Sequence, residues 1–578
     1  MPARTGTAHV VTTTRKYKDQ VYRTHLLRRS YREGGTVKNE TLGNLSHLPE
    51  PLIEIIRRSL QGETFVPLSR AFEILRSRPH GHVQAVAVAM QRLGLASVIA
   101  SKPRRERDLV LAMVASRIIE PAPKLATTRL WHTTTLAEEF GVVQANEDDL
   151  YAAMDWLLAR QDAIQKKLAA RHLSQGGLVL YDLSSSYFEG TTCPLAKRGY
   201  SRDGRPGTLQ VNYGLLTDPR GCPVAVSVHE GNTCDSRTFM PAVHKLRDDF
   251  GIEHMVMVGD RGMVSQKAID EMREMEGIGW ITALKSASIR ALVEQGHLQM
   301  DLFDERNLLE ISSPDYPGER LVACRNGALA KLRAHKREDL LGATERNLDK
   351  IKARVEAGKL GGQDAIGVRV GKVINQYKVA KHFELSITGT ALSWVRKPDS
   401  IAAEAALDGI YIVRTSVPAA LMDAPECVRS YKSLANVERA FRSMKTIDLK
   451  VRPIHHRLAD RVRAHVFLCT LAYYVEWHLR EAWRELMFAD TEQQAKATRD
   501  PVAPAERSTS AQGKAATHIL ADGTSAHSFS TLMADLATIV RNTCRAPNAE
   551  SDAPTFQVTT TAGTKQQRAI ELVHAITP

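Results

Sequence analysis

The chain has few cysteines and no long apolar run, and these two absences argue against disulfide-rich, zinc-binding and membrane-spanning classes of protein. Its 578 residues include 7 cysteines, with no CxxC pair and no histidines at zinc-ligand spacing. We therefore expect neither a disulfide framework nor a zinc site. No apolar run approaches the roughly 20 residues of a membrane-spanning helix, and the first sixteen residues lack an apolar signal core. These features predict a cytoplasmic protein with reduced thiols.

The net charge of the chain indicates what kind of partner it binds. Lysine and arginine number 78 against 65 aspartates and glutamates, which gives a net charge of +13. A basic chain of this length, long enough for about three or four domains, favours a polyanionic partner. Because acidic residues are also numerous, the basic charge must be concentrated in patches.

The N-terminal segment, residues 1–50, is one such patch. It holds nine basic and four acidic residues, and its strand-like stretches 20–32 and 36–42 flank Gly34-Gly35. This pattern predicts a basic β-hairpin region that contacts nucleic-acid backbone. A basic hairpin without a ligand is the alternative. The candidate DNA contacts here are Lys16, Arg28 and Arg29.

Residues 51–175 are dominated by apolar residues at helical spacing, which predicts a helical accessory domain. The period changes at residue 176. Strand-like stretches then alternate with helical ones up to residue 284, in the order β-β-β-α-β-α-β. An antiparallel meander that leads into βαβ crossovers fits a layered α/β core of the ribonuclease H-like kind.

The predicted core is interrupted before it is complete. Residues 285–408 mix strand-like stretches (320–324, 366–374 and 382–387) with a charged helix over 328–357. We interpret them as a β-rich insertion domain. Residues 409–488 would form the second part of the core, and residues 489–578, rich in small and polar residues at first, would form a linker and a loosely ordered tail.

Two aspartates stand at exceptional places in the predicted sheet. Asp182 lies in the middle of the apolar stretch 178–189, and Asp260 ends the strand-like stretch 252–258. A carboxylate inside an apolar strand is costly unless it is paired or bound to a metal. Ligands of α/β sheets gather at the carboxyl ends of strands. If these two strands are neighbours, the aspartates lie side by side.

A helix predicted over 431–445 supplies a third acid. At 100° per residue, Tyr431, Leu434, Glu438, Arg442 and Lys445 fall on one face, and an apolar stripe lies beside it. A surface helix with internal ion pairs is the alternative. Asp182, Asp260 and Glu438 together would form an oxygen-only cage suited to Mg²⁺ or Mn²⁺. Two such ions about 4 Å apart can promote phosphodiester cleavage.

The order of these motifs resembles a known family. YDLSSSYFEG, GYSRDGRPG with Gln210, EGNTCD, VGDRGM and Y-x2-L-x3-E-x6-K are similar to the successive motifs of bacterial insertion-sequence DDE transposases. The subgroup has a β-rich insertion before the glutamate and a Y-x2-R-x3-E-x6-K signature. The resemblance runs from the N-terminal hairpin to about residue 479. Leu434 departs from it, because the family usually has arginine there.

The resemblance implies a function and a site. Asp182, Asp260 and Glu438 would be the catalytic acids and would hold two Mg²⁺ ions, which Mn²⁺ can replace. The enzyme would bind terminal inverted repeats in double-stranded DNA, cleave the element ends and join them to target DNA, as a homodimer in the synaptic complex near the bacterial nucleoid. Tyr431 and Lys445 would hold DNA, and Trp394 is a candidate for stacking a flipped base. Further candidate DNA contacts are Arg202, Arg261 and Arg442.

Two other functions remain open at this point. A nuclease with the same core would cut DNA without strand transfer. A DNA-binding protein derived from a transposase would keep the fold and lose turnover, although the three acids stand in unbroken motifs.

Overall fold

The computed structural model describes residues 6–18, 20–65, 71–298, 303–493, 498–547 and 549–577. Arg4 and Asp19, two of the charges counted above, lie outside these ranges, as do residues 494–497 of the expected linker. The chain forms two compact units: Met1–Ser77 with Arg541–Thr560, and Arg78–Val540 with Thr561–Pro578. Each is described by itself.

The first unit is built on a small antiparallel sheet. Its strands are β1 (Thr7–Tyr17), β2 (Gln20–Glu33) and β3 (Thr36–Asn44), and helix α1 (Glu50–Leu60) follows. Gly34 and Gly35, with φ of 59° and 84°, make the turn between β2 and β3, a conformation that glycine adopts without steric cost. A second sheet has the order β17-β16-β4, from Thr555–Thr559, Val540–Arg545 and Glu73–Pro79.

A mixed sheet of nine strands forms the centre of the second unit. Strands β5, β9 and β10 run parallel, β7 and β8 form an antiparallel meander beside β5, and the order is β8-β7-β5-β9-β10. Helices α9 and α10 make the crossovers, which agrees with the element order predicted from the sequence. The bounds are β5 Gly177–Tyr187, β6 Lys197–Arg198, β7 Leu209–Thr217, β8 Pro223–Glu230, α9 Ser236–His244, η2 Lys245–Asp249, β9 Met255–Gly259, α10 Gln266–Arg273 and β10 Ile278–Ala283.

Helices cover both faces of this sheet. Tyr181 of β5 contacts Phe239 of α9, with ring centroids 6.0 Å apart. On the other face, Tyr213 of β7 contacts Phe441 of α16 (Leu434–Arg442) at 5.7 Å. Because side chains alternate along a strand, Asp182 lies on the opposite face from Tyr181, which is the face that α16 covers.

The helical region 78–175 does not have a core of its own. Its apolar side chains belong to the same core as the sheet, and the long buried helix α17 (Ala459–Ala482) packs on both. This differs from the expected accessory domain, whose first helix α1 lies in the other unit. The helices are α2 Gly81–Arg92, α3 Leu95–Ile99, α4 Arg105–Ile119, α5 Lys124–Leu130, α6 Leu136–Glu139, α7 Glu147–Leu158 and α8 Gln161–His172.

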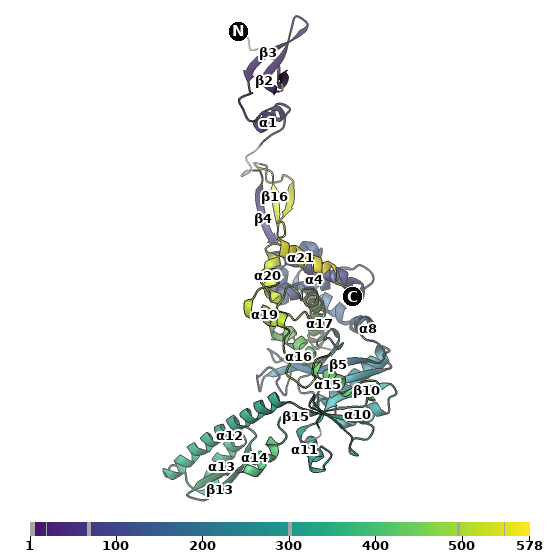
Figure 1. Ribbon diagram of the computed structural model, residues 1–578, viewed down its shortest axis with the longest axis vertical. Helices are drawn as coiled ribbons and strands as arrows, with labels where there is room; N and C mark the ends of the chain where they lie inside the picture. Colours follow the sequence, from purple (N-terminus) through teal and green to yellow (C-terminus); the bar gives the residue numbers. More distant parts are fainter. Residues whose placement is uncertain are drawn as a thin grey trace. The chain divides into compact units, whose positions relative to one another are not determined.

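The insertion over 285–408 is mainly helical, so the prediction of a β-rich domain is corrected. Residues 366–374 were expected as a strand but lie in α13 (Gln363–Ile374), where Ile366 and Val370, four residues apart, pack against α12 (Gly327–Glu356). Strands β11 (Leu308–Ile311) and β12 (Arg320–Arg325) extend the main sheet through β15 (Ile410–Thr415). Among the strands described in this segment, the hairpin β13–β14 alone lies with the helices (Figure 1). The remaining bounds are α11 Ser286–Glu294, η3 Ala380–His382, β13 Phe383–Ile387, β14 Leu392–Arg396 and α14 Pro398–Ala405.

The expected linker and tail contain regular structure where they are described. Helices α19 (Thr509–Thr517), α20 (Phe529–Ala537) and α21 (Thr564–His574) bury apolar side chains, and Ala569 and Val573 of α21 join the main core. None of the described helices combines the length and the apolar character that crossing a membrane requires.

Candidate active site

The sheet register brings the two aspartates together. Strands β5 and β9 pair in parallel, with Tyr181 opposite Gly259. Asp182 and Asp260 are the next residues on each strand, so the structure has the neighbouring arrangement that the sequence suggested. The Asp182 carboxylate accepts a hydrogen bond from the Leu183 backbone N–H at 2.8 Å.

Glu438 comes from a short helix rather than from one continuous helix. The chain forms α15 (Ala424–Lys432), then α16 (Leu434–Arg442), then a π-helical turn η4 (Ser443–Ile447). In α16, Val437, Ala440 and Phe441 are buried while Glu438 is exposed. Of the expected common face, Glu438, Arg442 and Lys445 still line one cavity, although Lys445 lies on the π turn, while Leu434 packs against the core.

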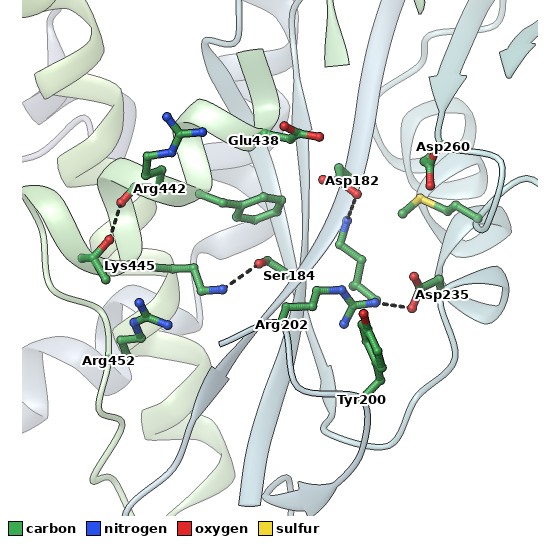
Figure 2. Close-up of a pocket in the computed structure, with 14 residues that line it drawn as sticks. Asp182, Ser184, Tyr200, Arg202, Asp235, Asp260, Glu438, Arg442, Lys445 and Arg452 are labelled. Carbon is green, nitrogen blue, oxygen red and sulfur yellow. Dashed lines mark hydrogen bonds and ion pairs between the residues drawn. The ribbon is translucent and has the colours of Figure 1, made fainter. Parts of the chain in front are cut away.

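The three acids line one cavity of about 480 Å³. Figure 2 shows the Asp182 carboxylate between those of Glu438 and Asp260, all facing the same space. Among the described residues the three carboxylates do not all come within 4.8 Å of one another. The cavity thus gathers acids from two strands and a helix without closing them into a tight cluster.

The carboxylates in this cavity repel one another, although cationic side chains also line it. Burial, followed by the charges of Glu438 and Asp260, raises the pKa of Asp182 to about 7, against the lowering effects of the Leu183 N–H and Arg202. A carboxyl group whose pKa is raised by burial and like charges is a marker of a functional site. An added cation would relieve the same repulsion.

Tyr431 connects the glutamate-bearing segment to Asp260. Its hydroxyl donates a hydrogen bond to Asp260 Oδ1 at 3.1 Å. The tyrosine side chain is half-buried against the core, and burial raises the pKa of its phenol. Tyr431 is therefore a neutral donor that fixes one face of the Asp260 carboxylate.

Lys445 points into the protein rather than into open solvent. Its Nζ lies 2.7 Å from Asp203 Oδ1 and donates to Ser184 Oγ at 3.0 Å, and Arg452 also pairs with Asp203. Asp203 is almost fully buried and accepts from the Tyr187 N–H at 2.8 Å. Sequence reasoning missed Asp203 and Arg452, although Asp203 stands in the quoted GYSRDGRPG motif.

Of the other candidate DNA-binding residues, some line the acid cavity and some lie elsewhere in the structure. Arg202 and Arg442 line the acid cavity, and Arg202 pairs with Asp235. Arg261 lines a different cavity beside α12, and Trp394 packs against Phe383 in the core of the insertion. In the first unit, Lys16 is exposed on β1, while Arg28 and Arg29 are half-buried on β2.

The donor set fits a hard divalent cation. Four carboxylates, those of Asp182, Asp235, Asp260 and Glu438, line the cavity, and no histidine or cysteine does. Oxygen ligands suit Mg²⁺ and Mn²⁺ and select against zinc. Since Asp235 is already paired with Arg202, the other three acids are the ones that would hold the ions.

One group of softer donors also exists. His172, Cys222 and His478 place one donor atom each within 4.8 Å of the others. His172 and His478 both hydrogen-bond to Tyr474, and burial raises the pKa of the Cys222 thiol well above its usual value. The thiolate that a metal would need is thus disfavoured, and the acid cavity remains the candidate site.

Comparison with protein families gives two matches. Residues 178–475, slightly more than half of the chain and including all three acids, match the Transposase DDE domain. Residues 10–66 match the N-terminal domain of IS1634 family transposases. The chain therefore belongs to the DDE transposase family, and the N-terminal match supports an insertion-sequence transposase.

The comparison with curated protein sequences gave no match. Among solved structures, the chain is similar to a cryo-EM structure of the piggyBac transposase synaptic complex with hairpin DNA. The two share 8% sequence identity at a TM-score of 0.34, over 79% of this chain and 78% of that one.

Proposed function

We propose that this transposase cleaves DNA at the ends of an insertion sequence and joins those ends to target DNA by two-metal-ion phosphoryl transfer. The observation that carries the proposal is the convergence of Asp182, Asp260 and Glu438, from β5, β9 and α16, on one cavity. The strand order β8-β7-β5-β9-β10 supports a ribonuclease H-like core. When bound there, two Mg²⁺ ions would activate the attacking oxygen and stabilise the leaving one.

The surrounding side chains have roles that follow from their contacts. Asp182, Asp260 and Glu438 would hold the metal ions, and Tyr431 fixes the orientation of Asp260. Lysine carries three N–H donors. Asp203 and Ser184 engage two of those on Lys445, which leaves one for a DNA phosphate. Arg442, exposed on the rim, would bind a phosphate in place of the arginine that Leu434 replaces.

The N-terminal unit would bind the terminal inverted repeats. Lys16, Arg28 and Arg29 lie on its antiparallel sheet, and basic side chains on such a surface suit phosphate contacts. Joining two element ends requires both ends in one complex, so we propose a homodimer in the synaptic complex. A cytoplasmic location and a contact from Arg261 remain sequence-based predictions.

The deciding experiment is strand cleavage in vitro. Purified protein is mixed with a labelled duplex that carries its own element end, in Mg²⁺, Mn²⁺ or EDTA. We expect metal-dependent nicking at the element boundary. In Glu438→Gln the rate of cleavage should fall by about 10³-fold or more, because a metal ligand is removed. Glu426→Gln, an exposed acid on the neighbouring helix α15, serves as the matched control and should cleave normally.

Other outcomes select other functions. Tight binding without cleavage in any metal would indicate a DNA-binding derivative. Nicking without joining to an added target duplex would indicate a nuclease, and Leu434→Arg would then be the first change to test for recovery of joining. Equal cleavage by Glu438→Gln and the wild type would refute the metal-cage proposal.

A further inference from the structure

A second cavity, of about 280 Å³, is lined by positive charge. It lies between the segment that joins α4 to α5 and residues 450–456, which follow the glutamate-bearing helix. Arg452 lines both this cavity and the acid cavity. The other cationic or imidazole side chains in its wall are Arg117, Lys124, Lys450, His455, His456 and His465.

Two of these cations are buried without a counter-charge. Lys124 and Arg117 are only 5% and 7% exposed. No carboxylate lines the cavity, and across the described residues neither side chain forms an ion pair. Arg117 makes one long hydrogen bond, to the Ala122 carbonyl at 3.4 Å.

Three acids contact side chains in or beside the cavity wall, and each is paired with a residue other than Arg117 and Lys124. Asp155 pairs with Arg461 at 3.5 Å, Glu189 lies 3.8 Å from His455, and Asp203 pairs with Lys445 and Arg452. A buried cation needs a partner or loses its proton. Accordingly, burial and the neighbouring Arg117 lower the pKa of Lys124 to about 7, and burial lowers that of His456 to about 3.

Because their pKa values are lowered by burial, His456 and His465 are neutral and add polarity without charge. His465 Nε2 lies 3.1 Å from the Val451 carbonyl oxygen, and its buried Nδ1 has no hydrogen-bond partner. The cavity therefore combines a planar guanidinium and an ammonium group, whereas the neutral His465, whose Nε2–H donates to Val451, offers only an acceptor at Nδ1. This combination suits a compact multivalent anion, and arginine and lysine are the usual ligands of phosphate in proteins.

We propose that this cavity binds a phosphate group. The phosphate would bridge Lys124 and Arg117 from the N-terminal helices to the segment 450–456, and so tie that segment in place beside the acid cavity. Two sources share this chemistry: a phosphate of the DNA backbone, which passes by way of Arg452 into the acid cavity, and a free phosphate ion or ester.

The first test uses inorganic phosphate and needs no DNA. Thermal unfolding of the wild type, Lys124→Met and Lys166→Met is followed with phosphate and with chloride at equal ionic strength. Lys166 is exposed on α8 and lines neither cavity, so its variant is the charge-matched control. We expect phosphate to raise Tm in the wild type and the control but not in Lys124→Met, which should itself be at least as stable as the wild type without phosphate.

Equal phosphate shifts in all three proteins, or no shift in any, would overturn the proposal. Should Lys124→Met fail to fold, Lys124→Gln and Arg117→Gln repeat the test with polar replacements. This arm does not depend on the proposed function, because it measures neither DNA binding nor cleavage.

The second test distinguishes the two sources and does rest on the proposed function. DNA affinity is measured against salt concentration in a Glu438→Gln background, with and without Lys124→Met. A DNA phosphate in the cavity predicts that the slope of log affinity against log salt falls by about one unit. An unchanged slope together with the phosphate-dependent Tm shift assigns the cavity to a free phosphate.

Discussion

The two cavities that share Arg452 differ in their carboxylates. Four carboxylates line the first beside four cationic side chains, whereas the second contains Arg117 and Lys124 and has no carboxylate among the described residues of its wall. In both, burial moves a pKa toward the neutral form: that of Asp182 up and that of Lys124 down, each to about 7. Each cluster is therefore built for a charge that the chain does not supply, a cation in one case and an anion in the other.

Between the cavities lies a charge cluster that is internally satisfied. Asp203 is buried and neutralised by Lys445 and Arg452, which come from the π turn and the segment after it. This comparison shows which buried charges are structural: those with partners inside the chain. The predictions below test that distinction, from the largest expected effect to the smallest.

The largest change in stability is expected at Asp203. Asp203→Asn keeps an acceptor for the Tyr187 N–H but leaves the buried Lys445 and the half-buried Arg452 without a counter-charge. Breaking a buried ion pair by removing one partner costs about 3–5 kcal/mol. Urea unfolding would measure this. Asp235→Asn removes an acid that pairs with Arg202 and is more exposed than Asp203, so it should cost about 1 kcal/mol or less. Equal costs at Asp203 and Asp235 would contradict the idea that buried charges with partners inside the chain are structural.

Lys124 in the second cavity and Asp182 in the acid cavity should make the free energy of unfolding depend on pH with opposite signs. The folded pKa of Lys124, about 7, lies below its ordinary value of 10.5, so the unfolded chain binds more protons between these pH values and stability should rise with pH there. The folded pKa of Asp182, also about 7, lies above its ordinary value of 3.8. Its contribution is complete below pH 3.8 and is lost as pH rises to about 7.

Urea unfolding across this pH range, in EDTA and without phosphate, checks both signs. Lys124→Met should flatten the dependence of stability on pH only between about pH 7 and 10.5, and Asp182→Asn only between about pH 3.8 and 7. Added Mg²⁺ should reduce the lower slope and added phosphate the upper slope, because each ligand stabilises the charged form. A variant that changes both windows equally would show that the cavities are not independent.

The sequence predicted the acid pair because strand position and strand order are local signals. Asp182 in an apolar run and Asp260 at a strand end define their places once β5 and β9 are neighbours. Glu438 was found by helical periodicity, which holds within α16. Periodicity did not predict the break at Ser433 or the π turn η4; Leu434 packs against the core, whereas Lys445, on the π turn, still lines the acid cavity.

The features that the sequence did not predict depend on contacts between residues distant in sequence. Residues 366–374 are rich in β-branched residues and read as a strand, yet packing against α12 makes them helical. Nothing in the spacing of Lys124 and Arg452 indicates a shared cavity, since 328 positions separate them in the sequence. Nor does the sequence around Asp203 indicate that this loop aspartate pairs with two cations, the buried Lys445 and the half-buried Arg452.

The smallest effect is expected at Tyr431, the neutral donor of the acid cavity. Tyr431→Phe keeps the ring against the core and removes only the hydrogen bond to Asp260. A hydrogen bond to a charged acceptor contributes about 1.5–3 kcal/mol, so single-turnover cleavage should slow by about ten- to 150-fold at saturating Mg²⁺. Tyr377→Phe, in the core of the insertion, is the matched control. If Tyr431→Phe were as inactive as Glu438→Gln, the hydroxyl would act on the DNA itself rather than through the orientation of Asp260.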